Sequence, residues 1–271
     1  MTRVLLKARG RSLLTSPSDY MDAGKWEGRL ALGAPVAVHD LEGSRSGKAQ
    51  EVTLAHPSGG VIKAVWKERR RDRDVRKGNI PLATNYLRER LAYEVSQIVG
   101  FCNIPATVIR RMEGRVGSMQ KLVLNADTWR DSELEYEDVE LREWQKLAVL
   151  DWIICSTDRH RGNWLICDGG HLKAIDNSLT FPEKTQWGMY RGYRSRPHWY
   201  VSENGDLELL DDVRRLLTPE AKRRCVVELM RFGVGLTGRA IFSSRWSQLV
   251  LTGALPPYVE EDKGFMREPP R

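Results

Sequence analysis

The 271-residue sequence lacks a long apolar run, a CxxC pair and an export signal. A bilayer-spanning helix needs about 20 mainly apolar residues, so no membrane span is expected. The four cysteines, Cys102, Cys155, Cys167 and Cys225, have no zinc-binding spacing and suit a reducing compartment. The opening residues MTRVLLKARGRSLL contain basic side chains but no apolar core or cleavage site. These absences together predict a cytoplasmic protein.

Charge is also unevenly distributed. The net charge of +7 comes mainly from KERRRDRDVRK at 67–77, and Arg191, Arg194 and Arg196 form a second basic group. Such segments either form ordinary solvated surface or attract phosphates, an acidic protein or an anionic membrane surface. No RNA- or DNA-binding motif accompanies them, so nucleic acid is not expected as a partner. The apolar fraction of 41% indicates a globular chain, long enough for one large domain or two lobes.

The first half of the sequence reads as a small sheet that carries one helix. Apolar residues at helical spacing predict a helix in TNYLRERLAYEVSQIVG, with Thr84 as its N-cap and Gly100 as its end. Turn residues and β-branched runs predict strands in the segments around it. These strands are expected within residues 26–39, 50–54, 61–66, 107–114 and 115–124. Residues 25–125 are therefore expected to form a β-rich N-lobe, preceded by an extension at 1–24.

The second half changes to helical patterns. Helices are expected in LREWQKLAVLDWIIC, in TPEAKRRCVVELMRFG with Thr218 as its N-cap, and in GRAIFSSRWSQLVL. A short hairpin is expected between Asn163 and Asp176, and the core should include Trp129, Trp144, Trp152 and Trp164. The prediction is an α+β fold with a mainly helical C-lobe at 126–255, a flexible tail at 256–271, and a ligand cleft between the lobes.

Two polar motifs flank the predicted hairpin, DRHRGNWL at 158–165 and IDNSLTFP at 175–182. The hairpin would return Asp176 to the loop that holds Asn163. Amide and carboxylate oxygens are hard ligands, suited to Mg²⁺ or Mn²⁺ that bridges phosphates. Asp158 would then accept a proton from an incoming hydroxyl, a division of labour that suits phosphoryl transfer. Taken singly, Asp158 could equally be structural and Asn163 could cap a turn.

The two motifs together resemble the catalytic and metal-binding segments of the phosphatidylinositol 3- and 4-kinase superfamily, especially the type II phosphatidylinositol 4-kinase-like branch and its bacterial relatives. The second motif is D-N-S and not the D-F-G of protein kinases. The resemblance implies a two-lobed protein-kinase-like fold and transfer of the γ-phosphoryl of ATP to a hydroxyl. It implies ATP and Mg²⁺ (or Mn²⁺) as cofactors, with Asp158 as the base and Asn163 and Asp176 as metal ligands.

The resemblance also implies roles upstream of the motifs. Lys67, at the end of a predicted strand, would contact the ATP phosphates, with Lys63 as the alternative. Glu89, in RERLAY, would position that lysine, with Glu94 as the alternative. Two further sets of residues would bind the nucleotide. A Gly/Ser break with Ser44, Ser46 and Gly47 would cradle phosphates, and Gln120, Lys121, Leu122 and Val123 would form the adenine-contacting hinge.

The acceptor is left open by the sequence. Residues 183–201 carry no recognised lipid-kinase signature, so a protein or small molecule ranks above an inositol lipid. The alternatives are a pseudokinase or nucleotidyl transferase on the same fold, and a non-catalytic basic module. A metallohydrolase could use Asp158, His160, His171 and Asp176, although the histidines lack helical spacing. His160 is interpreted as a structural hydrogen-bonding residue, and Asp151 as a brace for the loop.

Overall fold

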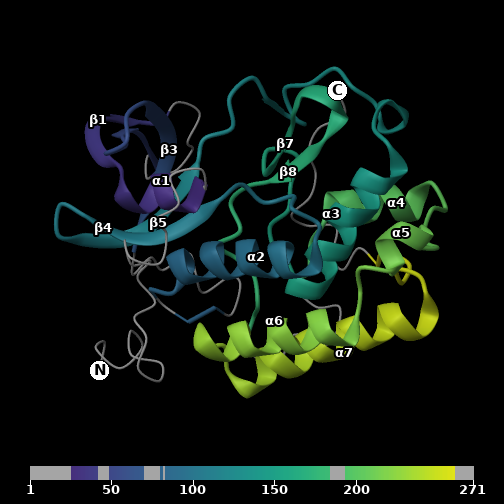
Figure 1. Ribbon diagram of the computed structural model, residues 1–271. Coiled ribbons are helices and arrows are strands. Elements are labelled where there is room, and N and C mark those ends of the chain that lie inside the picture. The colour runs from purple at the N-terminus through teal and green to yellow at the C-terminus, as the bar shows by residue number, and fades with distance from the viewer. Residues whose placement is uncertain (1–25, 42–48, 70–79, 82, 184–192, 260–271) are drawn as a thin grey trace.

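A computed structural model describes residues 26–41, 49–69, 80–81, 83–183 and 193–259. A five-stranded antiparallel sheet dominates the first part of the chain, and helices with a small three-stranded sheet make up the rest (Figure 1). The predicted α+β class, with a β-rich first part and a mainly helical second part, is confirmed. No helix within the described ranges is long and apolar enough to cross a bilayer.

The larger sheet has the strand order β1-β2-β3-β5-β4. Its strands are β1 (Ala34–Asp40), β2 (Ala49–Ala55), β3 (Val61–Glu68), β4 (Thr107–Met112) and β5 (Arg115–Lys121). Successive side chains of a strand point to opposite faces of the sheet, and those of Ile62, Ala64 and Trp66 in β3 all point into a buried cluster. Lys67 therefore faces the opposite side of the sheet.

The expectation of extended chain from residue 26 to residue 39 is wrong in its first half. Trp26–Leu32 forms helix α1, and β1 starts only at Ala34. The segment WEGRLAL is rich in good helix formers, and its helix buries Leu30 against the apolar face of the sheet. Gly33 joins helix to strand, where an added Cβ would lie 2.8 Å from both Arg29 O and Leu54 Cβ. Packing against the sheet thus stabilises a helix at Trp26–Leu32, where the sequence pattern had suggested extended chain.

Helix α2 (Asn85–Val99) occupies the predicted segment. Thr84 precedes it as expected, but its hydroxyl donates to Pro81 O at 2.6 Å and makes no capping hydrogen bond. Gly100 ends the helix with a left-handed φ of 86°, and its N–H returns to Ser96 O. The helix boundaries were therefore predicted correctly, whereas the capping interaction was not.

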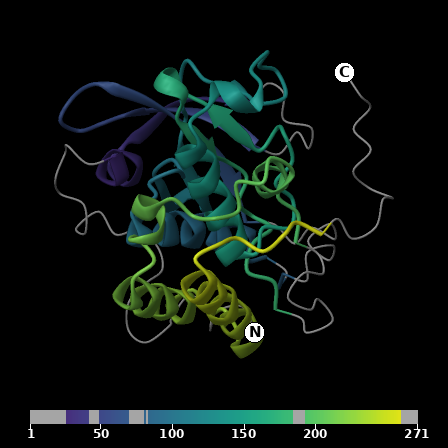
Figure 2. The same ribbon diagram turned by 90° about the vertical axis from the view of Figure 1, so that its right-hand side faces the viewer.

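The second part contains helix α3 (Leu141–Ile154) and a sheet of β6 (Asp127–Thr128), β7 (Trp164–Ile166) and β8 (Leu172–Ala174). Helices α4 (Arg196–Glu203), α5 (Asp211–Arg214), α6 (Pro219–Arg231) and α7 (Leu236–Thr252) follow, with α6 and α7 side by side at one edge of the molecule (Figure 2). Thr218 caps α6 as predicted, because its hydroxyl accepts from Ala221 N–H at 3.0 Å.

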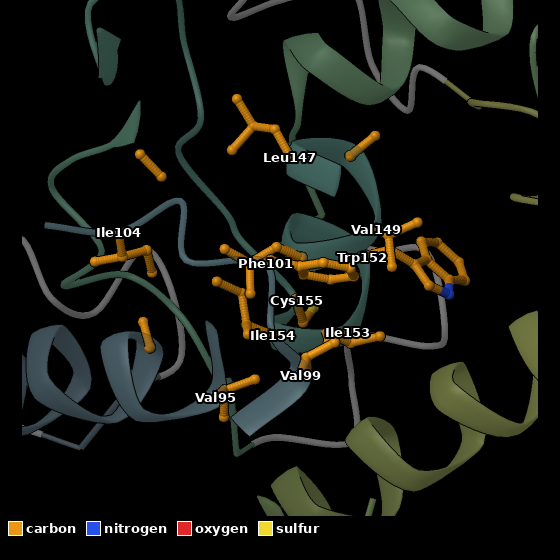
Figure 3. Close-up of a cluster of buried hydrophobic side chains, with 14 of the residues drawn as sticks. Val95, Val99, Phe101, Ile104, Leu147, Val149, Trp152, Ile153, Ile154 and Cys155 are labelled. Carbon is orange, nitrogen blue, oxygen red and sulfur yellow. The ribbon is translucent and has the colours of Figure 1, made fainter. Parts of the chain in front are cut away.

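One large hydrophobic core joins α2 to the helices of the second part. Figure 3 shows Val95 and Val99 of α2 beside Ile153 and Ile154 of α3, with Phe101 from the loop after α2 next to Cys155 in the same cluster. The four tryptophans expected in the core are buried there. Helix α2 is thus anchored to the helical body while it lies against the sheet. This double contact fixes the position of any side chain that α2 presents between the two parts.

The start of the predicted flexible tail is packed. The ring of His198 contacts Pro256 O at 2.8 Å through Nε2, and Tyr258 N–H donates to Ser202 Oγ at 3.0 Å. Residues 260–271 and the predicted extension at 1–24 lie outside the described residues.

Candidate active site

Lys67 of β3 and Glu89 of α2 form an ion pair. The ammonium of Lys67 lies 2.6 Å from Glu89 Oε1, and the Glu89 side chain is only 2% exposed. Of the alternatives, Lys63 instead pairs with Glu51, and Glu94 pairs with a neighbouring arginine of its own helix. The structure therefore brings together the two residues that were preferred from the sequence.

Asp176 completes a second ion pair with the same lysine. Its Oδ1 lies 3.0 Å from Lys67 Nζ and also accepts from the Ser178 hydroxyl at 3.2 Å. The Lys67 ammonium holds the pKa of Asp176 at about 2. Burial alone would lower the pKa of Lys67, but the carboxylates of Asp176 and Glu89 outweigh it and raise that pKa. Both charges are thus retained across the physiological range.

The backbone at Asp176 has a left-handed φ of 53°, a conformation that non-glycine residues seldom adopt. Such conformations persist where the surrounding contacts enforce them, and they concentrate at functional sites. Here the next N–H, that of Asn177, donates to Glu89 Oε2 at 3.0 Å. Burial raises the pKa of Glu89, and the Lys67 charge opposes the rise. Glu89 therefore connects the β3 lysine to the backbone beside Asp176.

The loop before β7 brings Asp158 and Asn163 to the same place. The amide nitrogen of Asn163 donates to Asp158 O at 2.8 Å, and its backbone carbonyl accepts from Ile175 N–H at 3.0 Å. Because the β7–β8 hairpin pairs Trp164 with Ala174, the two motifs meet as predicted. Burial raises the pKa of Asp158, the charge of Asp176 adds to the rise, and neighbouring cations oppose it. Two carboxyl groups with oppositely shifted pKa values thus share the site.

Arg159 is buried, and its guanidinium contacts both motifs. Its Nε donates to Asp151 Oδ1 at 3.0 Å. Its Nη1 donates to two backbone carbonyls, those of Asn163 at 2.8 Å and Ile175 at 2.6 Å, and its Nη2 donates to Asn177 Oδ1 at 2.6 Å. The planar fork of an arginine allows one side chain to reach all these acceptors.

Asp151 braces the loop through Arg159, in agreement with its interpretation from the sequence. It lies on α3, is fully buried, and also accepts from the Ser195 hydroxyl at 2.7 Å. Sequence reasoning missed Arg159 and Asn177. The available signal was the position of each beside a motif aspartate, Asp158 for the former and Asp176 for the latter.

A third residue that the sequence did not single out is Arg88. It precedes Glu89, is buried, and forms an ion pair with Glu183, seven residues after Asp176. Burial lowers the pKa of Arg88, and Glu183 opposes this effect. Gly235 approaches the same carboxylate so closely that an added Cβ would lie 3.0 Å from Glu183 Oε2. The pair therefore ties α2 to the segment after IDNSLTFP, and Gly235 at the start of α7 packs closely against it.

The predicted nucleotide-contacting residues are only partly described. Ser44, Ser46 and Gly47 lie outside the described residues, as does most of the basic run at 67–77. Gln120 and Lys121 belong to β5, and Gln120 donates to the Thr107 hydroxyl. The N–H groups of Lys121 and Leu122 donate to Ala106 O and Lys63 O within the sheet. A backbone N–H donor to adenine would therefore come from Val123 or a later residue.

The alternative metal cluster is not formed. Within the described ranges, no group of three or more His, Cys, Asp or Glu side chains is arranged to hold a metal. His171 is exposed in the hairpin turn, 3.6 Å from Glu143. His160 Nδ1 instead accepts from Gly162 N–H at 3.1 Å, which supports the structural interpretation of that histidine.

Comparisons with known proteins match part of this chain. Residues 109–195, which include both motifs, match the phosphatidylinositol 3- and 4-kinase family. The chain is 35% identical over 97 residues to the phosphatidylinositol 4-kinase gamma 4 of Oryza sativa subsp. japonica. That match covers 32% of this chain and 17% of the rice protein. In structure, the chain is similar to the Helicobacter pylori proinflammatory kinase CtkA, with a TM-score of 0.39 and 10% identity over 73% of this chain and 89% of that one.

The family match falls on the part of the sequence that suggested the resemblance, because residues 109–195 include both motifs. The predicted resemblance is therefore confirmed for this segment, which is similar in sequence to the phosphatidylinositol 3- and 4-kinase family.

Proposed function

We propose that the protein is an ATP-dependent phosphotransferase that moves the γ-phosphoryl group of ATP to a hydroxyl. In this proposal residues 25–125 form the N-lobe and 126–255 the C-lobe, and the nucleotide binds between them. The main supporting observation is the position of Lys67, which contacts Glu89 at 2.6 Å and Asp176 at 3.0 Å. One ammonium thus joins the sheet, α2 and the IDN motif where the two parts of the chain meet.

Lys67 is the proposed contact to the ATP phosphates. Its pKa is raised, so it remains a cation, and its side chain is 24% exposed and can reach a ligand. Glu89 would hold that ammonium in position, because Glu89 is itself fixed by the Asn177 N–H. Phosphoryl transfer depends mainly on positioning and on neutralising charge, and this pair would supply both.

Asp158 is the proposed base. It lies in the same loop as Asn163, and both burial and the nearby Asp176 charge raise its pKa. A carboxylate whose pKa is raised is a better proton acceptor than an ordinary one. Asp158 would therefore take the proton from the attacking hydroxyl.

Asn163 and Asp176 are the proposed ligands of Mg²⁺ or Mn²⁺. Their donor set fits such an ion, because the Asn163 nitrogen is committed to Asp158 O and leaves its oxygen as the donor, and Asp176 is ionised with a pKa of about 2. Two oxygen donors do not saturate Mg²⁺, which takes its other ligands from water and from phosphates. The bound ion would neutralise charge on the transferred phosphoryl group.

The acceptor class follows less directly from the site. The described residues around Asp158 do not distinguish a protein or small-molecule hydroxyl, which the sequence ranks first, from an inositol-lipid hydroxyl. The name of the rice relative supports including the lipid among the first acceptors tested. Its match covers only a small share of that protein, so its activity is not transferred to this chain.

The proposed function is tested by label transfer and by ligand-induced stabilisation. The protein is incubated with γ- or α-labelled ATP and with vesicles containing phosphatidylinositol, a cell extract or neither. Transfer from the γ position is expected. Transfer from the α position alone would make the protein a nucleotidyl transferase. Absence of both transfer and nucleotide binding would leave a basic module without catalysis.

A matched pair of variants tests the metal assignment. Nucleotide with Mg²⁺ at about 100 times its Kd should stabilise the parent protein by about 2.7 kcal/mol. Asp176→Asn should lose the metal-dependent part of this stabilisation, whereas Asp168→Asn, in the exposed turn of the same hairpin, should keep it. Equal stabilisation of both variants would contradict the role given to Asp176.

A further inference from the structure

A cavity lies against the face of the larger sheet opposite to Lys67. It has a volume of about 390 Å³ and is lined by side chains from α1, α2, the loop after α2, the end of β5 and β8. In the strand register, Lys121 of this cavity lies opposite Ala64, whose side chain belongs to the cluster beneath α1. Lys67 lies opposite Ser118 on the other face. The Lys121 side chain therefore lies on the opposite face of the sheet from Lys67, although the cavity shares Lys121 and Val123 with the segment that the sequence assigns to the adenine-contacting hinge.

Two lysines give the cavity its charge. The Lys121 ammonium lies 3.7 Å from the centre of the Trp26 ring, and the Lys173 ammonium donates to Cys102 O at 2.6 Å. The two are near enough that Lys173, after burial, contributes to lowering the pKa of Lys121. The one carboxylate among the described lining residues, that of Glu27, accepts from the Tyr93 hydroxyl. The cavity therefore contains two ammonium groups and one carboxylate, and that carboxylate already has a hydrogen-bond donor in Tyr93.

The other walls of the cavity are mostly apolar, with Gln97 of α2 as a polar exception. Ile104 and Pro105 are buried, and Ala106 and Val123 are half-buried beside the ring of Trp26. A volume above about 300 Å³ with apolar walls and a few convergent polar groups is typical of small-molecule sites. Ammonium groups bind carboxylates through charge-assisted hydrogen bonds. A flat apolar body could stack on the Trp26 ring once its carboxylate has drawn the Lys121 ammonium off that ring, where the ammonium now lies at 3.7 Å.

We propose that this cavity binds a small organic anion with a flat apolar body, such as an aromatic carboxylate, through Lys121 and Lys173. The walls include Tyr93, one helical turn beyond Glu89 on α2. A ligand here would therefore brace the helix that carries Glu89. The binding proposal itself does not depend on the phosphotransfer activity.

Cys102 makes the site testable, because its thiol is exposed and lines the cavity. Cys155 and Cys225 are buried, so a Cys167→Ser background leaves Cys102 as the accessible thiol. Three disulfide probes share one phenylethyl thiol arm and differ only in a para carboxylate, carboxamide or aminomethyl group. Each is equilibrated with the protein and excess 2-mercaptoethanol. Intact mass spectrometry with peptide mapping then measures the fraction captured at Cys102.

The carboxylate probe should be captured about tenfold more strongly than the carboxamide, the gain expected from one charge-assisted hydrogen bond, and the aminomethyl probe least. Lys121→Gln and Lys173→Gln should each reduce this preference, and Lys222→Gln, on distant α6, should not. Unchanged capture of the carboxamide probe would show that a variant retains the cavity. Equal capture of carboxylate and carboxamide by the parent, or a preference that survives both cavity substitutions, would overturn the proposal.

Discussion

Replacing Arg159 with methionine should destabilise the protein more than any comparable change at its surface. The Arg159 side chain is 1% exposed and pairs with Asp151, which is 0% exposed. Arg159→Met keeps most of the volume but leaves the Asp151 carboxylate buried with only the Ser195 hydroxyl as a side-chain donor. It also removes the Arg159 donor from the Ile175 carbonyl and the Asn177 amide oxygen, and one of the two donors to the Asn163 carbonyl.

The expected loss follows from these contacts. Removing one partner of a buried pair costs about 3–5 kcal/mol, because the remaining charge is left uncompensated. Domains are stable by about 5–15 kcal/mol, so the variant should be marginally folded. The free energy of unfolding is measured by equilibrium urea denaturation followed by far-UV circular dichroism. Arg159→Lys, which keeps the charge but not the planar fork, should lose less.

Arg142 provides the matched control. It pairs with Asp212 at 2.6 Å, but both side chains are nearly half exposed. Arg142→Met should therefore change the free energy of unfolding by no more than about 1 kcal/mol. If Arg159→Met costs no more than Arg142→Met, the idea that Arg159 holds the two motifs together is refuted.

Three further outcomes are expected. Gly117→Ala should lower the free energy of unfolding by about 1–3 kcal/mol, because the new Cβ would lie 2.3 Å from Lys67 O. Urea denaturation measures this loss, and an unchanged free energy of unfolding would contradict the close approach. Burial lowers the pKa of His198 from 6.5 to about 4, so the folded state favours the neutral ring. The contribution of His198 to the free energy of unfolding is therefore fully present above pH 6.5 and is lost as the pH falls towards 4. Across that window the parent should lose about 3 kcal/mol more than His198→Gln, and equal pH profiles would refute the argument. Thr218→Ala should cost about 1 kcal/mol through the lost cap of α6, whereas Thr252→Ala, at the last residue of α7, serves as the comparison because it removes no N-cap.

The sequence predicted the local elements well where one local pattern dominated. The helical spacing of Leu87, Leu91 and Val95 fixed α2, and Gly100 marked its end because only a residue tolerant of positive φ fits there. The pattern failed at Trp26–Leu32, where contact with the sheet decides between helix and strand. It also failed at Thr84, whose hydroxyl has a competing acceptor in Pro81 O.

The order of the polar motifs also predicted which residues would form the candidate site. Asp158, Asn163 and Asp176 are joined by a short hairpin, so their convergence follows from local chain geometry. Arg159 could not be assigned in this way. Its role depends on acceptors from α3, the loop and the strand end, and on burial that no single segment reveals.

By itself, the sequence determined the sheet-then-helix order, the hairpin and the family resemblance of the two motifs, because these depend on neighbours a few residues apart. Only the tertiary structure decided that Lys67 meets Glu89, 22 positions away, and Asp176, 109 positions away. It also decided that Lys121 faces away from them. Such contacts depend on how the sheet packs against α2 and the helical body, and that packing is set by the whole core.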